Sequence, residues 1–250
     1  MVITKFQSII FSFALLLTAC TSVQHISKTD VNYSVVRKET AAAEKQEVTT
    51  LIAPYKSQLD AVMNEELGTL PVDLTKQKPE STLGNWAADA LLDRVRKEGL
   101  EADFAIVNYG GLRLTYLTKG TLTRGELFEL SPFDNVLQVV DVPGIKLDSV
   151  FQLIAETDGW PVSKGVKLVI GNKKLISATI NNMPLDHSKM YKMATIDYVA
   201  TGGDNMKFLI PLSRKQTSLI FRDVLIDHVK EATAAGKPVT ASLEGRITVQ

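Results

Sequence analysis

The segment from Phe104 to Arg113 reads FAIVNYGGLR and says more about the fold than any other part of the chain. Its first four residues are apolar, and a short apolar run followed by a turn is typical of a buried strand. The next four residues, Asn108 to Gly111, predict that turn, where two adjacent glycines let the backbone approach a ligand closely. Arg113 follows and carries a planar fork of donors suited to phosphate or carboxylate. The segment therefore predicts a buried strand that ends at a turn, although an arginine after a glycine turn is, taken alone, usually a surface charge.

Outward from this segment, apolar periodicity and turn residues divide the chain into further elements. Helices are predicted from Val48 to Gly68, from Ser81 to Gly99, from Arg124 to Glu129 after Thr123 as N-cap, from Leu147 to Ala155 and from Leu219 to Ala232. The first helix shows an apolar stripe of Leu51, Ile52, Tyr55, Leu59, Val62, Met63 and Leu67. Strands are predicted from Asn135 to Val142 and from Tyr191 to Ile196, with a hairpin of Val166–Ile170 and Leu175–Ile180 and turns at Pro143-Gly144 and Thr201–Asp204.

The order of these elements predicts the fold class. Helices and strands mix without a regular alternation, which favours an α+β fold with a mixed sheet and packed helices. No Pro- or Gly-rich linker interrupts residues 47–250, so we expect them to form a single domain.

The first 46 residues differ in composition and predict export. Residues 1–19 contain one charge and an apolar run from Ile9 to Leu17, which is shorter than the roughly 20 residues of a membrane span and typical of a signal peptide. The run ends in Leu17-Thr18-Ala19-Cys20, which resembles the bacterial lipobox, whose cysteine is acylated; the alternative is a free cysteine in an uncleaved anchor helix. The polar residues 20–46 predict a flexible tether. We therefore expect a protein of the cell envelope, anchored by lipid to a membrane on its periplasmic or surface face.

Charge and metal-ligating residues exclude several classes of function. Lys plus Arg (28) equals Asp plus Glu (28), so the chain lacks the basic excess of a nucleic-acid-binding protein. A single cysteine permits neither an intramolecular disulfide nor a CxxC zinc site. The three histidines, His25, His187 and His228, have no companion at metal-ligand spacing. We therefore expect neither a metal nor a cofactor on this chain.

Five motifs follow one another along the chain. They are ESTLGNWAADA (Glu80–Ala90), NYGGLR (Asn108–Arg113), LSPFDN (Leu130–Asn135), DYVATGGD (Asp197–Asp204) and EGRI (Glu244–Ile247). In order and spacing they resemble the C-terminal domain of the 5'-nucleotidase and UDP-sugar hydrolase family over residues 50–250. Any one glycine pair is a weak signal, whereas five motifs in order are a specific one.

The resemblance implies an aromatic clamp for a nucleoside base. In the family, one ring belongs to the P-F motif, here Phe133, and the other precedes the G-G-D turn, here Tyr198. Tyrosine for phenylalanine keeps the stacking face, and stacking contributes roughly 1–3 kcal/mol per base. The alternative is that both rings pack in the core, as most aromatic side chains do.

The resemblance also implies polar contacts to the ligand. Asn108 and Arg113 match positions that contact base and substrate, and Gly110 and Gly111 keep the backbone close to the ligand. Asp204 matches the aspartate that binds the ribose hydroxyls; alternatively it is a turn residue that caps its own backbone. None of these positions is expected to be catalytic.

One departure concerns the phosphate. Family members usually carry an arginine shortly before the N-L-G-N motif, whereas this chain has Lys76-Gln77-Lys78-Pro79. Lysine is a poorer bidentate partner than arginine. We therefore expect base stacking more firmly than phosphate binding.

In the family, hydrolysis takes place on a separate metallophosphatase domain with two metal ions, and its ligand pattern does not occur in this sequence. One hypothesis is a split enzyme: this lipoprotein recognises the nucleotide or nucleoside, and another chain supplies the divalent metals. A second hypothesis is a surface lipoprotein that binds nucleosides or nucleotides without catalysis. A third is a degenerate domain kept as a structural or protein-interaction element.

Overall fold

The structure, a computed structural model, describes residues 46–250. The helices are α2 (Gln46–Met63), α3 (Thr82–Lys97), α4 (Arg124–Leu130), α5 (Gly144–Glu156), α6 (Asp197–Ala200) and α7 (Phe221–Ala234), with 3₁₀ turns η2 (Tyr109–Gly111), η3 (Gly203–Asn205) and η4 (Lys207–Leu209). The predicted signal peptide, Cys20, His25 and residues 20–45 of the predicted tether lie outside the described residues. Contacts divide the chain at Leu51, so the compact unit described below spans residues 52–250.

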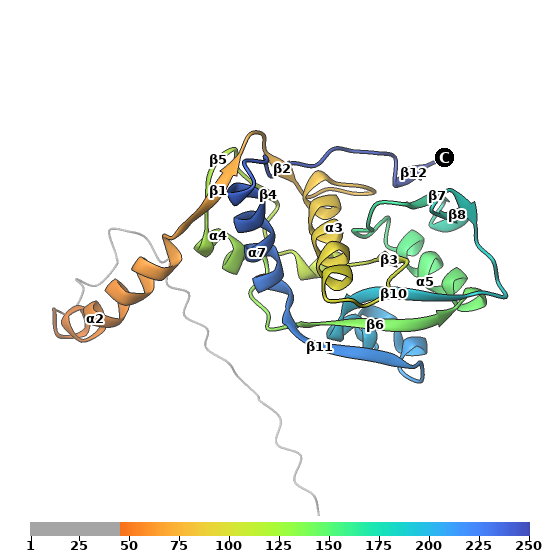
Figure 1. Cartoon of the computed structure of the whole chain (residues 1–250), viewed down its shortest axis with the longest axis horizontal. Helices are drawn as coiled ribbons and strands as arrows, with labels where there is room; N and C mark the ends of the chain where they lie inside the picture. Colours follow the sequence, from red (N-terminus) through yellow and green to blue (C-terminus); the bar gives the residue numbers. More distant parts are fainter. Residues whose placement is uncertain (1–45) are drawn as a thin grey trace, which may run out of the picture. The chain divides into compact units, whose positions relative to one another are not determined.

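Two four-stranded sheets form the framework (Figure 1). The first has the order β11-β6-β10-β3, from Arg214–Ile220, Val136–Pro143, Met190–Ile196 and Phe104–Ala105. The second has the order β12-β7-β8-β9, from Ile247–Val249, Val166–Gly171, Lys174–Ile180 and Met183–Pro184. Two small ladders pair β1 (Glu66–Leu70) with β5 (Gly120–Thr123) and β2 (Leu74–Thr75) with β4 (Tyr116–Leu117). Because parallel and antiparallel pairs occur within one sheet, the predicted α+β class with a mixed sheet is confirmed.

Helices join these sheets into one hydrophobic core. Helix α5 packs against β6 of the first sheet and against β7 and β8 of the second. Helices α3 and α7 lie side by side (Figure 1), and the Trp86 ring of α3 meets the His228 ring of α7 edge-on, with 6.0 Å between centroids. Within residues 46–250 there is no helix with both the length and the apolar character needed to span a membrane.

Local signals placed several element ends correctly. Ser81 is the N-cap of α3, and its hydroxyl accepts a hydrogen bond from the Gly84 amide. Thr123 caps α4 in a reciprocal capping box with Glu126. The predicted hairpin of β7 and β8 is present, although its left-handed turn residues are Asn172 and Lys173, with φ of 48° and 60°.

The prediction was wrong at the end of the first helix. Helix α2 ends at Met63, and Gly68 lies within strand β1 instead of closing the helix. A Cβ at Gly68 would lie 2.2 Å from Thr233 Oγ1, so the glycine is required for β1 to approach α7. The apolar stripe did not predict burial either, because five of its side chains are exposed: Leu51, Ile52, Tyr55, Leu59 and Val62.

Two further differences come from tertiary contacts. The predicted turn at Pro143-Gly144 is the junction of β6 and α5, where a Cβ on Gly144 would lie 2.1 Å from the Asp186 carbonyl oxygen. Strand β11, whose side chains are mostly charged or polar, was not predicted; it pairs with β6 and leads directly into α7.

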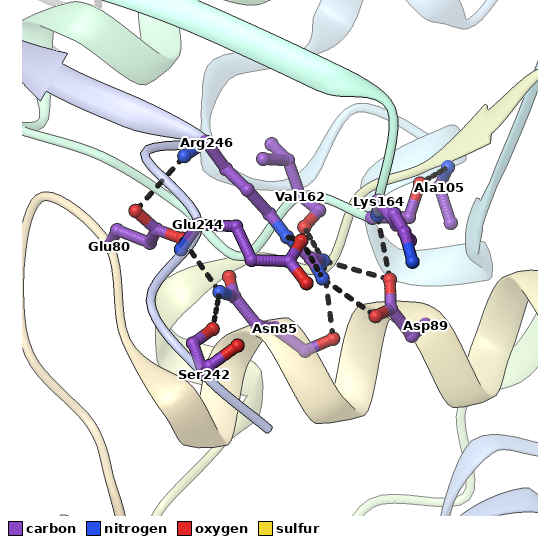
Figure 2. Close-up of polar contacts among 10 residues, drawn as sticks. Glu80, Asn85, Asp89, Ala105, Val162, Lys164, Ser242, Glu244 and Arg246 are labelled. Atoms are coloured by element: carbon purple, nitrogen blue, oxygen red, sulfur yellow. Dashed lines mark hydrogen bonds and ion pairs between the residues drawn. The ribbon is translucent and has the colours of Figure 1, made fainter. Parts of the chain in front are cut away.

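The EGRI motif is a structural clamp, a role that the sequence did not reveal. Figure 2 shows Arg246 extending from the C-terminal segment to Asp89 on α3. The guanidinium, only 3% exposed, donates to both Asp89 oxygens at 2.8 and 2.7 Å and to the Val162 carbonyl oxygen at 2.9 Å. The Arg246 amide donates to Glu80, whose other oxygen accepts from the amide of Glu244. These bonds fasten the C-terminal segment to α3, to Glu80 just before that helix, and to Val162.

Candidate functional site

A pocket of about 290 Å³ opens where three separate segments of the described chain meet. Its lining consists of Asn108, Gly110, Gly111, Arg113, Phe133, Asn135, Tyr198 and Asp204. The pocket therefore brings together every residue that the sequence proposed for substrate binding. Asn135 adds to them; it was visible as the last residue of the LSPFDN motif but received no role.

Asn108 holds the first side of the pocket in place. It follows the buried β3 region, is 5% exposed, and its Nδ2 donates to Asp204 Oδ2 at 2.7 Å. Its Oδ1 is buried and has no hydrogen-bond partner among the described residues. A Cβ at Gly111 would lie 2.6 Å from that oxygen, so only glycine leaves room for the amide. The Asn108 side chain thus links the NYGGLR turn to the TGGD turn.

The TGGD turn depends on its glycines for two separate reasons. Gly202 adopts φ of 98°, a conformation that favours glycine. A Cβ on Gly203 would lie 2.5 Å from Tyr198 Cε1, so this glycine lets the turn fold against the ring. Asp204 follows in the left-handed region with φ of 47°, and its carboxylate accepts from both Asn108 and Tyr198. It does not act merely as a cap for its own turn.

The two aromatic rings differ from core aromatics in their exposure. Phe133 is 43% exposed and Tyr198 is 44% exposed, whereas Phe104 and Phe151 in the core are fully buried. The alternative that both rings are core packing is therefore excluded. The Arg113 guanidinium carbon lies 5.9 Å from the Phe133 centroid, within the range of a cation–π contact.

Three cations gather beside the pocket. Lys76 Nζ donates to the Leu112 carbonyl oxygen at 2.6 Å and lies 4.0 Å from the Tyr109 ring centroid, while Lys78 Nζ lies 4.7 Å from the same centroid. Burial, together with the nearby charges of Arg113 and Lys78, lowers the pKa of the Lys76 amine. The two lysines of the KQKP segment therefore bring positive charge next to Arg113. Gln77, which lies between them, is exposed and adds no charge.

Histidine and carboxylate side chains do not form a metal centre within the described residues. His187 Nε2 lies 3.0 Å from Asp148 on the surface, and His228 packs against Trp86, where burial lowers its pKa. No group of three or more His, Cys, Asp or Glu side chains among residues 46–250 is placed to share an ion. The described residues therefore do not fit the two-metal centre of the full-length family.

Solved structures define the class to which this fold belongs. The 5'-nucleotidase precursor of Thermus thermophilus matches with a TM-score of 0.70 and 25% identity, over 81% of this chain and 43% of that chain. The NAD nucleotidase of Haemophilus influenzae shares the fold with a TM-score of 0.59 at 20% identity, over 82% of this chain and 41% of that one. The class is thus a domain of the kind found in 5'-nucleotidases.

The sequence profile of the family described as "5'-nucleotidase, C-terminal domain" matches residues 66–210, more than half of the chain. The protein therefore belongs to this family.

Curated relatives are considerably longer. The cell wall protein Lmo0130 of Listeria monocytogenes is 27% identical over 80% of this chain and 29% of its own length. The trifunctional nucleotide phosphoesterase YfkN of Bacillus subtilis is 27% identical over 86% of this chain and 16% of its own length. UshA of Escherichia coli is 30% identical over 65% of this chain and 30% of its own length. The chain spans less than a third of each of these relatives.

Proposed function

We propose that the pocket binds a nucleoside or nucleotide, with the base between Phe133 and Tyr198. The observation that carries this proposal is the convergence of two half-exposed rings, two amides, a carboxylate and a guanidinium on one small pocket. A volume of about 290 Å³ lies just below the range for sites of drug-sized ligands, roughly 300–1,000 Å³. Such a pocket suits one nucleoside-sized ligand.

Each polar group has a task in this proposal. Asp204 keeps free lone pairs for the vicinal hydroxyls of a ribose, because a carboxylate offers about four acceptor sites and two are used. Asn108 supports this carboxylate, because its Nδ2 donates to Asp204 Oδ2 at 2.7 Å. Arg113, with Lys76 and Lys78 nearby, favours a phosphate on the ligand over an uncharged nucleoside.

The pocket is built for recognition rather than for bond cleavage. Tyr198 is the only phenol among its lining residues, and the hydrogen bond to Asp204 raises the pKa of that phenol, which is the reverse of activating a nucleophile. We therefore propose that hydrolysis depends on a metallophosphatase supplied by a separate chain, which carries the divalent metals. The name of one longer relative, a trifunctional nucleotide phosphoesterase, supports a nucleotide as the ligand.

The second candidate function is binding without catalysis, as a surface receptor. It rests on the same pocket and differs only in lacking a catalytic partner. A hydrolysis assay separates the two: AMP with this protein alone, with a metallophosphatase chain from the same organism alone, and with both. We expect hydrolysis only when both are present. Binding of AMP with no gain in hydrolysis from the pair would favour the receptor.

Calorimetry with AMP tests the pocket itself. We expect Phe133→Ala and Tyr198→Ala each to weaken binding by about 5- to 150-fold, the range for loss of one stacking contact. Tyr116→Ala is the matched control, because Tyr116 is an exposed aromatic residue that does not line the pocket. Equal affinity of all three variants and the parent protein would refute the aromatic clamp.

We further propose a cell-envelope location with a lipid anchor on Cys20. The name of the Listeria relative, a cell wall protein, supports the envelope. Cys20→Ser should abolish incorporation of labelled palmitate and move the protein to the aqueous phase in detergent partitioning. Unchanged labelling of Cys20→Ser would refute the anchor.

A further inference from the structure

The Asp204 carboxylate is held at both oxygens before any ligand is bound. Asn108 Nδ2 donates to Oδ2 at 2.7 Å, and the Tyr198 hydroxyl donates to Oδ1 at 2.9 Å. Asp204 and the next residue, Asn205, both have positive φ, 47° and 69°. Aspartate and asparagine adopt this left-handed region more readily than other non-glycine residues, but at a cost in backbone strain. The two hydrogen bonds to the carboxylate offset part of that cost.

The same hydrogen bond restrains the Tyr198 ring. The ring lies on the short helix α6 and is packed on one side by Gly203, where a Cβ would lie 2.5 Å from Cε1 and 2.6 Å from Cζ. Rotation about the ring-bearing bond is otherwise broad in aromatic side chains. Close packing by Gly203 and the bond to Asp204 together restrict that rotation. Phenylalanine would keep the packing but lose the bond.

We propose that Tyr198 is a positioning residue that couples base stacking to ribose recognition through Asp204. This inference rests on the proposed nucleoside site. With its hydroxyl bonded to Asp204, Tyr198 fixes the carboxylate so that one free acceptor position on each oxygen faces a vicinal diol as the base meets the ring. The pocket therefore selects ribonucleosides over nucleosides that lack the 2'- and 3'-hydroxyls, and part of that selection comes from the tyrosine hydroxyl.

The binding test compares adenosine with 2',3'-dideoxyadenosine by calorimetry. We expect Tyr198→Phe to weaken adenosine binding about tenfold, the lower end for losing a hydrogen bond to a charged group. Dideoxyadenosine should change less than about threefold, because it makes no diol contact with Asp204. Tyr116→Phe, a tyrosine outside the pocket, is the matched control and should leave both affinities unchanged.

A double-mutant cycle shows whether the hydroxyl acts through Asp204. Asp204→Gly removes the carboxylate and suits the positive φ, so the fold should tolerate it. In that background, Tyr198→Phe should have no further effect on adenosine. An equal loss from Tyr198→Phe with and without the carboxylate would overturn the coupling.

A ligand-free measurement tests the bond independently. The hydrogen bond to Asp204 raises the pKa of the Tyr198 phenol. In ultraviolet titration, the difference between the parent protein and Tyr198→Phe isolates this phenol, and the same difference in the Asp204→Gly background should titrate at lower pH. No such decrease would overturn the inference. If adenosine binds and Phe133→Ala weakens this binding while Tyr198→Phe does not change it, only the positioning role of Tyr198 fails. If neither adenosine nor AMP binds, the proposed function fails, and the positioning role fails with it.

Discussion

Removing Asp89 should destabilise the protein more than removing any exposed carboxylate. Asp89 accepts two hydrogen bonds from the Arg246 guanidinium, at 2.8 and 2.7 Å, and one from the Lys164 amide at 2.7 Å. Burial acts to lower the pKa of Arg246, but Asp89 and Glu244 raise it, so the guanidinium remains charged. Asp89→Ala therefore leaves a buried cation without its main partner.

The magnitude follows from the exposure of the two partners. Breaking a fully buried ion pair by removing one partner costs about 3–5 kcal/mol. The Arg246 side chain is 3% exposed but Asp89 is 30% exposed, so water partly replaces the carboxylate. We expect a loss of about 2–4 kcal/mol in the free energy of unfolding. The destabilisation caused by Arg246→Met should differ between the parent protein and the Asp89→Ala variant. The corresponding double-mutant cycle should give a coupling energy of about 1–3 kcal/mol.

Urea unfolding of the full chain, followed by tryptophan fluorescence and circular dichroism, measures these changes. Glu101→Ala is the control, because Glu101 makes an exposed ion pair with Lys192 and such pairs contribute about 0–1 kcal/mol. A loss for Asp89→Ala no larger than that of Glu101→Ala would refute the reasoning. So would full additivity of Asp89→Ala and Arg246→Met.

Three further predictions concern single positions. Gly111→Ala should displace the Asn108 amide, lower stability by about 1–3 kcal/mol and weaken AMP binding. Denaturation and calorimetry would measure these changes. Wild-type behaviour would show that the 2.6 Å contact between the added Cβ and Asn108 Oδ1 relaxes without cost. Asn205→Gly should change stability by less than about 1 kcal/mol in urea, because the relief of strain at a φ of 69° is offset by the greater backbone entropy of glycine in the unfolded chain; a larger loss would mean that the Asn205 side chain contributes contacts of its own. His228 is buried against Trp86 and its pKa is lowered from 6.5, so the unfolded chain binds the proton more readily and stability falls as pH decreases below about 6.5. The parent protein should therefore lose more stability than His228→Gln between pH 7.5 and 5.5, and equal losses would contradict the assignment.

The composition of the candidate site could be predicted because its motifs are local. Asn108, Gly111 and Asp204 stand in short patterns whose order carried the family resemblance, and the structure places them around one pocket. Lys76 could not be placed in this way. Its position beside Arg113 depends on strand β2 pairing with β4, a contact between segments about forty residues apart.

The end of the first helix was predicted wrongly and strand β11 was not predicted, because both depend on contacts between distant segments. The periodic apolar residues after Val48 predicted a helix correctly, but the pattern does not say where a helix stops when a strand with apolar residues follows it. Strand β11 carries mostly polar and charged side chains, so no apolar alternation marked it before its pairing with β6 was known.

The sequence by itself determined the α+β class, the helix caps at Ser81 and Thr123, and the residue types of the site, because caps and turns depend on backbone chemistry within a few residues. Only the tertiary structure decided that the rings of Phe133 and Tyr198 are exposed. It alone also decided that Arg246 is buried against Asp89. Burial and pairing depend on which distant segments pack together, and no local pattern contains that information.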